Sequence, residues 1–170
     1  MQATNAVKAV RKLGPDAIDI IAPAHGVCWR SHVADILDAY ENVYTSGKLE
    51  EKALVAYDSM WGSTDKMAHA IADGFLAAGV PVRLMDVKCT HISDVMEEFL
   101  DCKYVAMGSP TLNSQMMPPM AELITYMKGL SPKNEGRVGI PFGSYGWAPL
   151  GPKNIASELE GVGFELPLGT

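Results

Sequence analysis

The sequence predicts an α/β protein built on a doubly wound parallel sheet with strand order 2-1-3-4-5. From residue 53 onward, short apolar runs alternate with longer segments in which apolar residues recur at helical spacing. Gly79 and Gly129 end two of the helical segments; Pro118 opens the segment that ends at Gly129, and Pro152 opens a later one. This alternation is typical of parallel strands that are joined by right-handed helical crossovers.

The expected strands are residues 53–57, 82–87, 104–108, 138–142 and 164–168. The expected helices are residues 67–76, residues 92–100 with Thr90 as the N-cap, residues 118–128, and a segment that begins at Pro152. Pro141 predicts a short or bulged fourth strand, because proline is rare inside a central strand. No helical segment follows the fifth strand, so this domain is expected to be truncated at its C-terminus.

Residues 1–47 predict a helix, a strand, a loop and a second helix. The first helix has apolar residues at helical spacing up to Leu13. The strand covers residues 18–21, and Ser31 is the expected N-cap of the second helix. Because these elements are too few to enclose a core, we interpret them as the tail of a larger domain.

The amino-acid composition limits which partners the protein can bind and in which cellular compartment it is expected. The 170 residues carry a net charge of -6, with a pI near 5.1, and contain no basic cluster, which argues against a nucleic-acid partner. No apolar run approaches the ~20 residues of a membrane span, and no signal-peptide core is present. Cys28, Cys89 and Cys102 are widely spaced and odd in number, so neither disulfides nor a cysteine metal site is indicated. We therefore expect a cytoplasmic protein without a membrane partner.

The turn after the first expected strand has the residues of a phosphate site. It runs through Ser59, Met60, Trp61, Gly62, Ser63 and Thr64 into a helix. Free N–H groups and the positive dipole end of a helix attract phosphate, hydroxyl groups add donors, and glycine permits close approach. The turn lacks the P-loop and dinucleotide-binding glycine patterns, and it suits a single terminal phosphate, as in FMN. For this loop alone, a Ser/Thr helix cap is an open alternative.

Two later loops favour a cofactor site. Pro110, Thr111, Leu112 and Asn113 follow the third expected strand, and Ser144, Tyr145, Gly146 and Trp147 follow the fourth. Ligands of open parallel sheets bind outside the carboxyl ends of the strands, so the three loops are expected to converge on one crevice. The second loop offers polar groups for the edge of a heteroaromatic ring, and the aromatic residues of the first and third offer stacking surfaces.

These loops resemble those of the flavodiiron proteins, the A-type flavoprotein family. From about residue 52 onward, the chain looks like the C-terminal flavodoxin-like domain of that family, on the motifs at residues 59–64, 109–113 and 143–147. Residues 21–30 resemble the end of its metallo-β-lactamase-like domain. The resemblance implies that residues 1–47 are a remnant of this domain with a linker helix. It also implies that residues 52–170 form a flavodoxin-like FMN-binding domain without its final helix.

The resemblance implies an FMN-binding electron-transfer domain of an oxygen or nitric oxide reductase, which passes electrons from a reduced donor to a diiron site. Since FMN carries the redox chemistry, no side chain is expected to be catalytic. The implied FMN contacts come from the fourteen loop residues named above. After Trp147, residues 148–151 depart from the family's glycine-rich sequence, so the flavin contact there is expected to differ.

His25 corresponds, by this resemblance, to the last ligand of the family's diiron centre. Such a centre needs several histidine and carboxylate ligands. The family's His-x-Glu-x-Asp pattern is absent from this sequence, so we expect no diiron centre in this chain alone. The family also implies a small electron donor (rubredoxin, reduced deazaflavin or an NAD(P)H-linked reductase) and a head-to-tail homodimer of the intact protein.

Two other functions fit parts of the sequence. A stand-alone NAD(P)H:quinone reductase of the same fold would explain the phosphate loop, but it explains neither His25 nor the residues before the sheet domain. A phosphoacceptor signalling domain would need a reactive aspartate at the end of a central strand. Asp58 follows the first strand, but the third strand ends in Gly108-Ser109-Pro110, which makes this interpretation the weakest of the three.

Overall fold

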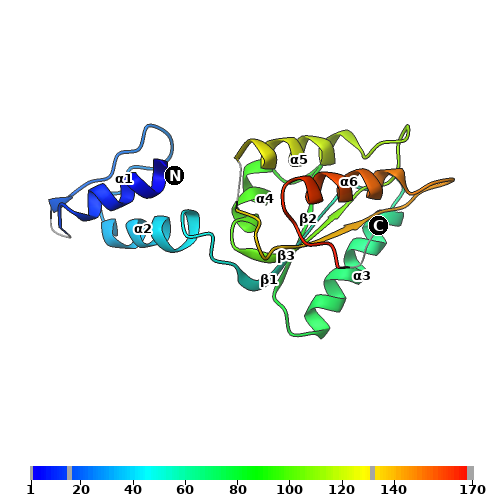
Figure 1. The fold of residues 1–170 in the computed structure, drawn as a ribbon, viewed down its shortest axis with the longest axis horizontal. Helices are drawn as coiled ribbons and strands as arrows, with labels where there is room; N and C mark the ends of the chain where they lie inside the picture. The colour runs from blue at the N-terminus through cyan, green and yellow to red at the C-terminus, as the bar shows by residue number, and fades with distance from the viewer. Residues whose placement is uncertain (1, 15–16, 131–132, 168–170) are drawn as a thin grey trace. The chain divides into compact units, whose positions relative to one another are not determined.

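The computed structural model describes residues 2–14, 17–130 and 133–167. The chain divides into two compact units, Met1–Lys48 and Leu49–Thr170. Figure 1 shows a sheet with surrounding helices in the second unit and short helices in the first.

The second unit contains a parallel sheet in the order β2-β1-β3-β4, which confirms the predicted α/β class and strand order (Figure 1). Its strands are β1 (Glu50–Tyr57), β2 (Val82–Asp86), β3 (Cys102–Gly108) and β4 (Val138–Phe142). The predicted fifth strand is represented by one parallel bridge between Glu165 and Val138, at the outer side of β4. Residue 168, its predicted end, lies outside the described residues.

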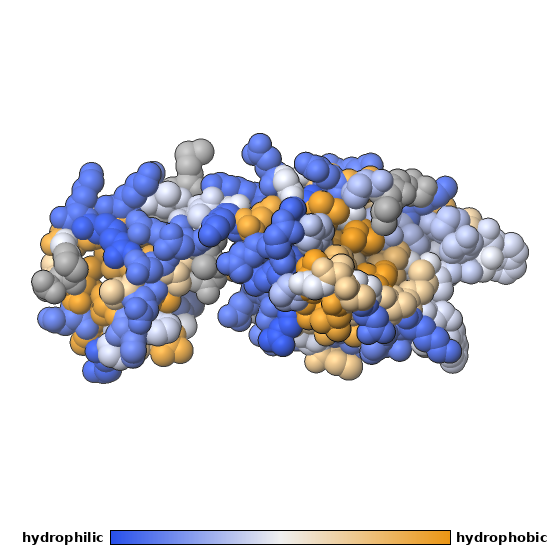
Figure 2. Space-filling view, turned by 90° about the horizontal axis from the view of Figure 1, so that it is seen from below, coloured by the Kyte–Doolittle hydropathy of each residue, from blue (hydrophilic) through white to orange (hydrophobic). Residues whose placement is uncertain are grey.

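Four helices cover the two faces of this sheet: α3 (Ser63–Ala77), α4 (Ile92–Phe99), α5 (Pro118–Leu130) and α6 (Leu150–Gly161). Successive residues of a strand point to opposite faces, so each strand supplies two cores. Leu54 and Val105 pack in one core with residues of α4, α5 and α6, whereas Val55 and Ala106 pack in the other with α3 (Figure 1). On the α3 side, apolar surface remains exposed (Figure 2).

Several predicted boundaries differ from the structure. The first strand begins at Glu50, three residues before the predicted start, and α3 begins four residues before residue 67. Thr90 is not the N-cap of α4; His91 is, and its ring nitrogen accepts a hydrogen bond from the Ser93 N–H. The periodicity of apolar residues predicts the middle of a helix or strand. It does not predict the polar ends, because individual hydrogen bonds determine at which residue the element begins or ends.

Of the two alternatives predicted from Pro141, a short or a bulged strand, the bulge is absent, and β4 has five residues. The β3–β4 pairing runs in continuous register from Tyr104↔Val138 to Gly108↔Phe142. The Gly139 N–H donates to Glu165 O at 2.8 Å, on the side of β4 away from β3. Pro141, two residues further, lacks its N–H on that same side. Proline therefore removes no hydrogen bond between β3 and β4.

The first unit contains α1 (Gln2–Arg11), α2 (Val33–Ala39) and the π-helical segment η2 (Tyr40–Tyr44). The strand predicted at residues 18–21 is reduced to one antiparallel bridge between Ile21 and Trp29. Ser31 does not cap α2, because His32 occupies the N-cap position with φ 58° and without a side-chain cap hydrogen bond. Among the side chains described in this unit, Val7 is the buried apolar one.

Among the described residues, no helix is both long enough and apolar enough to cross a membrane.

Candidate cofactor site

The loop between β1 and α3 presents an uncapped helix N-terminus. Gly62 is the N-cap of α3, with φ 80°, and no side chain caps the helix. A positive φ is strained for other residues, so glycine suits this position. The first intrahelical bond is from Lys66 N–H to Gly62 O, which leaves the N–H groups of the first turn without helical partners. The loop thereby offers amide donors and the positive dipole end of α3 to an anion.

The three hydroxyl groups of this loop have different positions. The Ser59 hydroxyl oxygen accepts a hydrogen bond from the Gly62 N–H at 3.0 Å, which folds the turn. Ser63 is exposed. Thr64 is buried, and its hydroxyl lies 3.0 Å from the Ser144 hydroxyl. Ser63 is therefore the freest donor, and Thr64 links the start of α3 to the loop after β4.

The loops after β3 and β4 are joined by backbone contacts. The Thr111 N–H donates to Ser144 O at 2.8 Å, and the Ser109 N–H donates to Phe142 O at 3.1 Å. A Cβ atom at Gly143 would lie 1.8 Å from Ser109 O, so only glycine permits this approach. The three loops after β1, β3 and β4 thus form one connected structure.

A cavity of about 300 Å³ lies between these three loops. Its lining residues are Met60, Trp61, Ser63, Pro110, Thr111, Ser144, Tyr145 and Gly146. The volume is at the lower end of the range for small-molecule sites. Trp61 is 88% exposed, and Tyr145 and Trp147 are also exposed. Exposed aromatic rings next to a polar crevice are available to stack on a planar ligand.

The structure brings the predicted site residues together to different degrees. Eight of the fourteen line the cavity. Ser59, Gly62 and Thr64 shape the loop that ends at α3. Asn113 has a positive φ of 49° and Leu112 pairs with Gln115, so both belong to the turn that supports the second loop. Trp147 follows the lining residue Gly146 and is fully exposed. His25, the predicted metal ligand, is exposed in the first unit.

Sequence reasoning missed a lysine at this site. Lys88 follows β2, and its ammonium nitrogen donates to Ser59 O at 2.5 Å and lies 3.5 Å from Asp58 Oδ1. Asp58 is buried, and burial raises the pKa of its carboxyl group, while Lys88 lowers it. The signal available in the sequence was that Asp58 directly follows β1 and Lys88 lies two residues after β2, because both strands end at the same sheet edge.

A second ionisable pair stabilises the start of α3. The Tyr57 hydroxyl donates to Asp65 Oδ1 at 2.7 Å. Burial, together with this carboxylate, raises the pKa of Tyr57 far above its usual value. Tyr57 therefore stays protonated and acts as a fixed donor that connects β1 to the first turn of α3.

The donor set of the cavity fits a phosphate-bearing planar ligand and not a metal ion. Amide and hydroxyl groups converge on it, and metal ions of biological sites prefer carboxylate, imidazole or thiolate ligands. In the described part of the chain, no group of three or more His, Cys, Asp or Glu residues could hold a metal ion. The uncapped start of α3 matches the phosphate of a flavin mononucleotide, and the exposed aromatic rings match its planar ring system.

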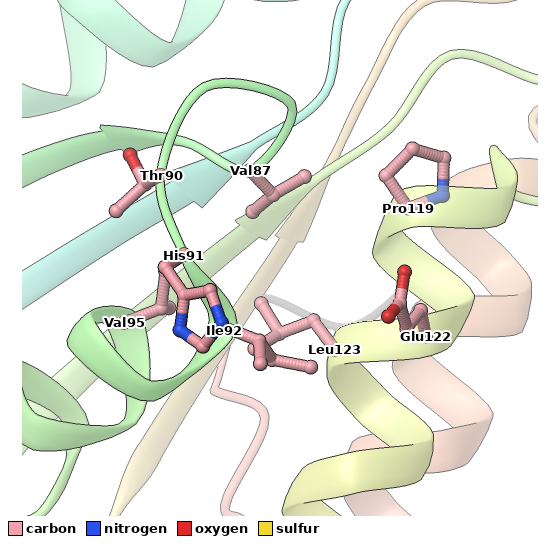
Figure 3. Close-up of a pocket in the computed structure, with 8 residues that line it drawn as sticks. All are labelled: Val87, Thr90, His91, Ile92, Val95, Pro119, Glu122 and Leu123. Carbon is pink, nitrogen blue, oxygen red and sulfur yellow. The ribbon is translucent and has the colours of Figure 1, made fainter.

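A second cleft lies between α4 and α5 (Figure 3). It has a volume of about 200 Å³, below the range of most small-molecule sites. Figure 3 shows the His91 ring at the start of α4 and the Glu122 carboxylate on α5, with apolar residues such as Val95 and Leu123 between the helices. None of the predicted site residues lines this cleft.

The strand order β2-β1-β3-β4, with a ligand crevice at the carboxyl edge of the sheet, is the arrangement of a flavodoxin-like protein. A family model described as flavodoxin matches residues 55–169, and the chain therefore belongs to the flavodoxin family. A flavodoxin domain implies FMN as its cofactor.

Several of the similar proteins are longer, and two of those described next are named as oxidoreductases or reductases. A nitric oxide reductase of Moorella thermoacetica is 41% identical over 150 residues, which are 88% of this chain and 37% of that protein. The structure of rubredoxin oxygen:oxidoreductase from Desulfovibrio gigas has a TM-score of 0.83 and 36% identity, and covers 98% of this chain and 42% of its own. The flavodiiron protein from Giardia intestinalis has a TM-score of 0.84 and 29% identity, with 97% and 41% covered. The chain spans about two fifths of the length of these relatives.

Proposed function

We propose that residues 49–170 bind FMN and carry electrons as part of a flavodiiron-type oxygen or nitric oxide reductase. The observation that carries the proposal is the connection of three loops around one cavity at the uncapped start of α3. The names of the similar proteins, a nitric oxide reductase and a rubredoxin oxygen:oxidoreductase, support the reaction class.

Different residues of the chain would contact the phosphate and the ring of FMN. Ser63, Gly62 and the first-turn amides of α3 would hold the phosphate. Thr111 and the backbone of residues 110–113 would contact the polar edge of the ring, and Trp61 and Tyr145 would stack on its faces. When bound, FMN supplies one- and two-electron redox chemistry, and the protein sets its potential by hydrogen bonds and nearby charge. No side chain is required as an acid, base or nucleophile.

Residues 1–47 belong, in this proposal, to the end of a metallo-β-lactamase-like domain, with His25 as one ligand of a diiron centre. The alignments that cover 97–98% of the chain support this assignment, because they include these residues. The remaining ligands would come from the part of the relatives' length that this sequence does not span. Rubredoxin, reduced deazaflavin or an NAD(P)H-linked reductase would donate electrons, in the cytoplasm and within a head-to-tail homodimer.

Flavin titrations with and without the phosphate test the proposal. FMN is expected to bind about a hundredfold or more tightly than riboflavin, because several charge-assisted hydrogen bonds contribute about 1.5–3 kcal/mol each. Ser63→Ala is expected to weaken FMN about tenfold and to leave riboflavin unchanged. Thr64→Ala is expected to weaken both, since Thr64 also fixes the Ser144 loop.

Ser93→Ala is the matched control, since Ser93 is an exposed serine in the first turn of α4. It should bind both flavins like the unchanged protein. Equal affinity of the unchanged protein for FMN and riboflavin would contradict the proposed phosphate site.

A further inference from the structure

Lys88 connects the turn after β2 to the first loop of the cavity. Its ammonium nitrogen donates to Ser59 O at 2.5 Å and lies 3.5 Å from Asp58 Oδ1. Asp58 and Ser59 are consecutive, so one side chain contacts two residues at the start of the loop that leads to α3. The contact joins segments that are 29 residues apart in the sequence.

The backbone around Lys88 is itself fixed. The Lys88 N–H donates to Asp86 Oδ1 at 2.9 Å, and the Val87 N–H donates to Tyr57 O at 3.0 Å. The turn that carries Lys88 is therefore tied to the end of β1. Because this backbone is already fixed, holding the ammonium group in one place costs the rotamer entropy of the lysine side chain and no further backbone entropy.

Asp58 gives the ammonium group an electrostatic role. Its side chain is fully buried, and in the described part of the chain the Lys88 ammonium nitrogen, 3.5 Å from Oδ1, is the cation paired with it. A buried carboxylate without a compensating charge is costly. A phosphate at the start of α3 would bring a second negative group to the same loop, and like charges at close range disfavour each other.

We infer that Lys88 is a positioning residue of the FMN site, which compensates the Asp58 charge, fixes the Ser59 carbonyl and thereby sets the preference for FMN over riboflavin. The inference rests on the proposed function, because the preference exists only if residues 59–64 bind the phosphate. Lys88 acts through Ser59 and Asp58 and need not touch the cofactor.

Flavin titrations of four variants test this role. Lys88→Met is expected to weaken FMN about tenfold and to change riboflavin affinity less than about twofold. Lys88→Arg keeps the charge and is expected to retain most of the FMN affinity. Lys88→Met combined with Asp58→Asn is expected to regain most of it, because no uncompensated anion remains. Lys103→Met removes another lysine of an ion pair, with Glu51, at the opposite end of the sheet, and should have no effect.

Each outcome decides the inference, provided that circular dichroism shows each variant folded. The Lys88 side chain is 42% exposed, so methionine is tolerated there. Equal losses for FMN and riboflavin, no loss at all, or no recovery in the double variant would each overturn the positioning role while the proposed function stands. If the unchanged protein does not distinguish FMN from riboflavin, both the inference and the proposed function fail.

Discussion

Different interactions stabilise the two units of the chain, each within itself. The second unit has a core on each face of its sheet, whereas the described side chains of the first include one buried apolar residue, Val7. The same residue type illustrates the contrast. Arg137 is 1% exposed and donates hydrogen bonds to backbone carbonyl groups, whereas Arg11 forms ion pairs with Asp38 and Glu41 at the surface. Packing and buried hydrogen bonds therefore stabilise the unit that carries the cofactor site, and surface contacts connect the helices of the other.

Substitution of Arg137 is expected to lower the free energy of unfolding more than any other substitution in this comparison. Its guanidinium group donates to the carbonyl oxygens of Phe99, Leu100 and Cys102 at 2.5–3.0 Å and lies 4.2 Å from the Phe99 ring centre. Burial lowers its pKa to about 10, so it remains charged at pH 7. Arg137→Met would leave these carbonyl groups without partners and is expected to lower the free energy of unfolding by about 3 kcal/mol or more.

Urea denaturation at unchanged m-value measures this loss. Arg11→Met is the matched variant in the first unit, and it is expected to leave the urea midpoint nearly unchanged, because exposed ion pairs contribute little. A midpoint shift for Arg11→Met as large as that for Arg137→Met would show that surface pairs matter as much as the buried network.

The sequence predicted the fold correctly in the segments where the periodicity of apolar residues distinguishes strands from helices. Alternation of apolar runs and helical segments predicted a parallel sheet, because each apolar run is a buried strand with two covered faces. The strand order was predicted as the simplest arrangement of such a sheet. The short strand predicted at residues 18–21 did not form, since apolar β-branched residues predict a strand only where a partner strand is present. Arg137 was missed because nothing in its local sequence distinguishes a buried cation from a surface one.

The candidate site was predictable to a similar extent. The three loops follow from strand ends and turn residues, which are local features. The contacts of Lys88 with Ser59 and Asp58, and of Thr64 with Ser144, join residues that are 29 or more positions apart. Such contacts depend on the register between strands, which a single sequence does not determine.

The reactivity of the three cysteines is expected to differ between buried and exposed positions. Cys102 is buried in the second unit, its thiol donates to Glu98 O, and burial raises its pKa to about 12. Since the thiolate is the reactive form, Cys102 is expected to remain unlabelled by a thiol reagent at pH 8 until the protein unfolds. Cys28 and Cys89 are exposed and are expected to react at once.

A colorimetric thiol assay should therefore count two cysteines in the native protein and three in denaturant. Immediate reaction of all three would mean that the core beneath β3 opens readily. That result would mean that the core of the second unit is no better protected from solvent than the exposed surface of the first.

Hydrogen exchange of the full chain, with and without FMN, reports which amides the cofactor protects. We expect slower exchange in residues 59–64, 110–113 and 144–147 together, and no change in the described residues before Leu49. Protection confined to one loop, or found instead at the cleft between α4 and α5 or in the first unit, would contradict the claim that the three loops form one FMN site.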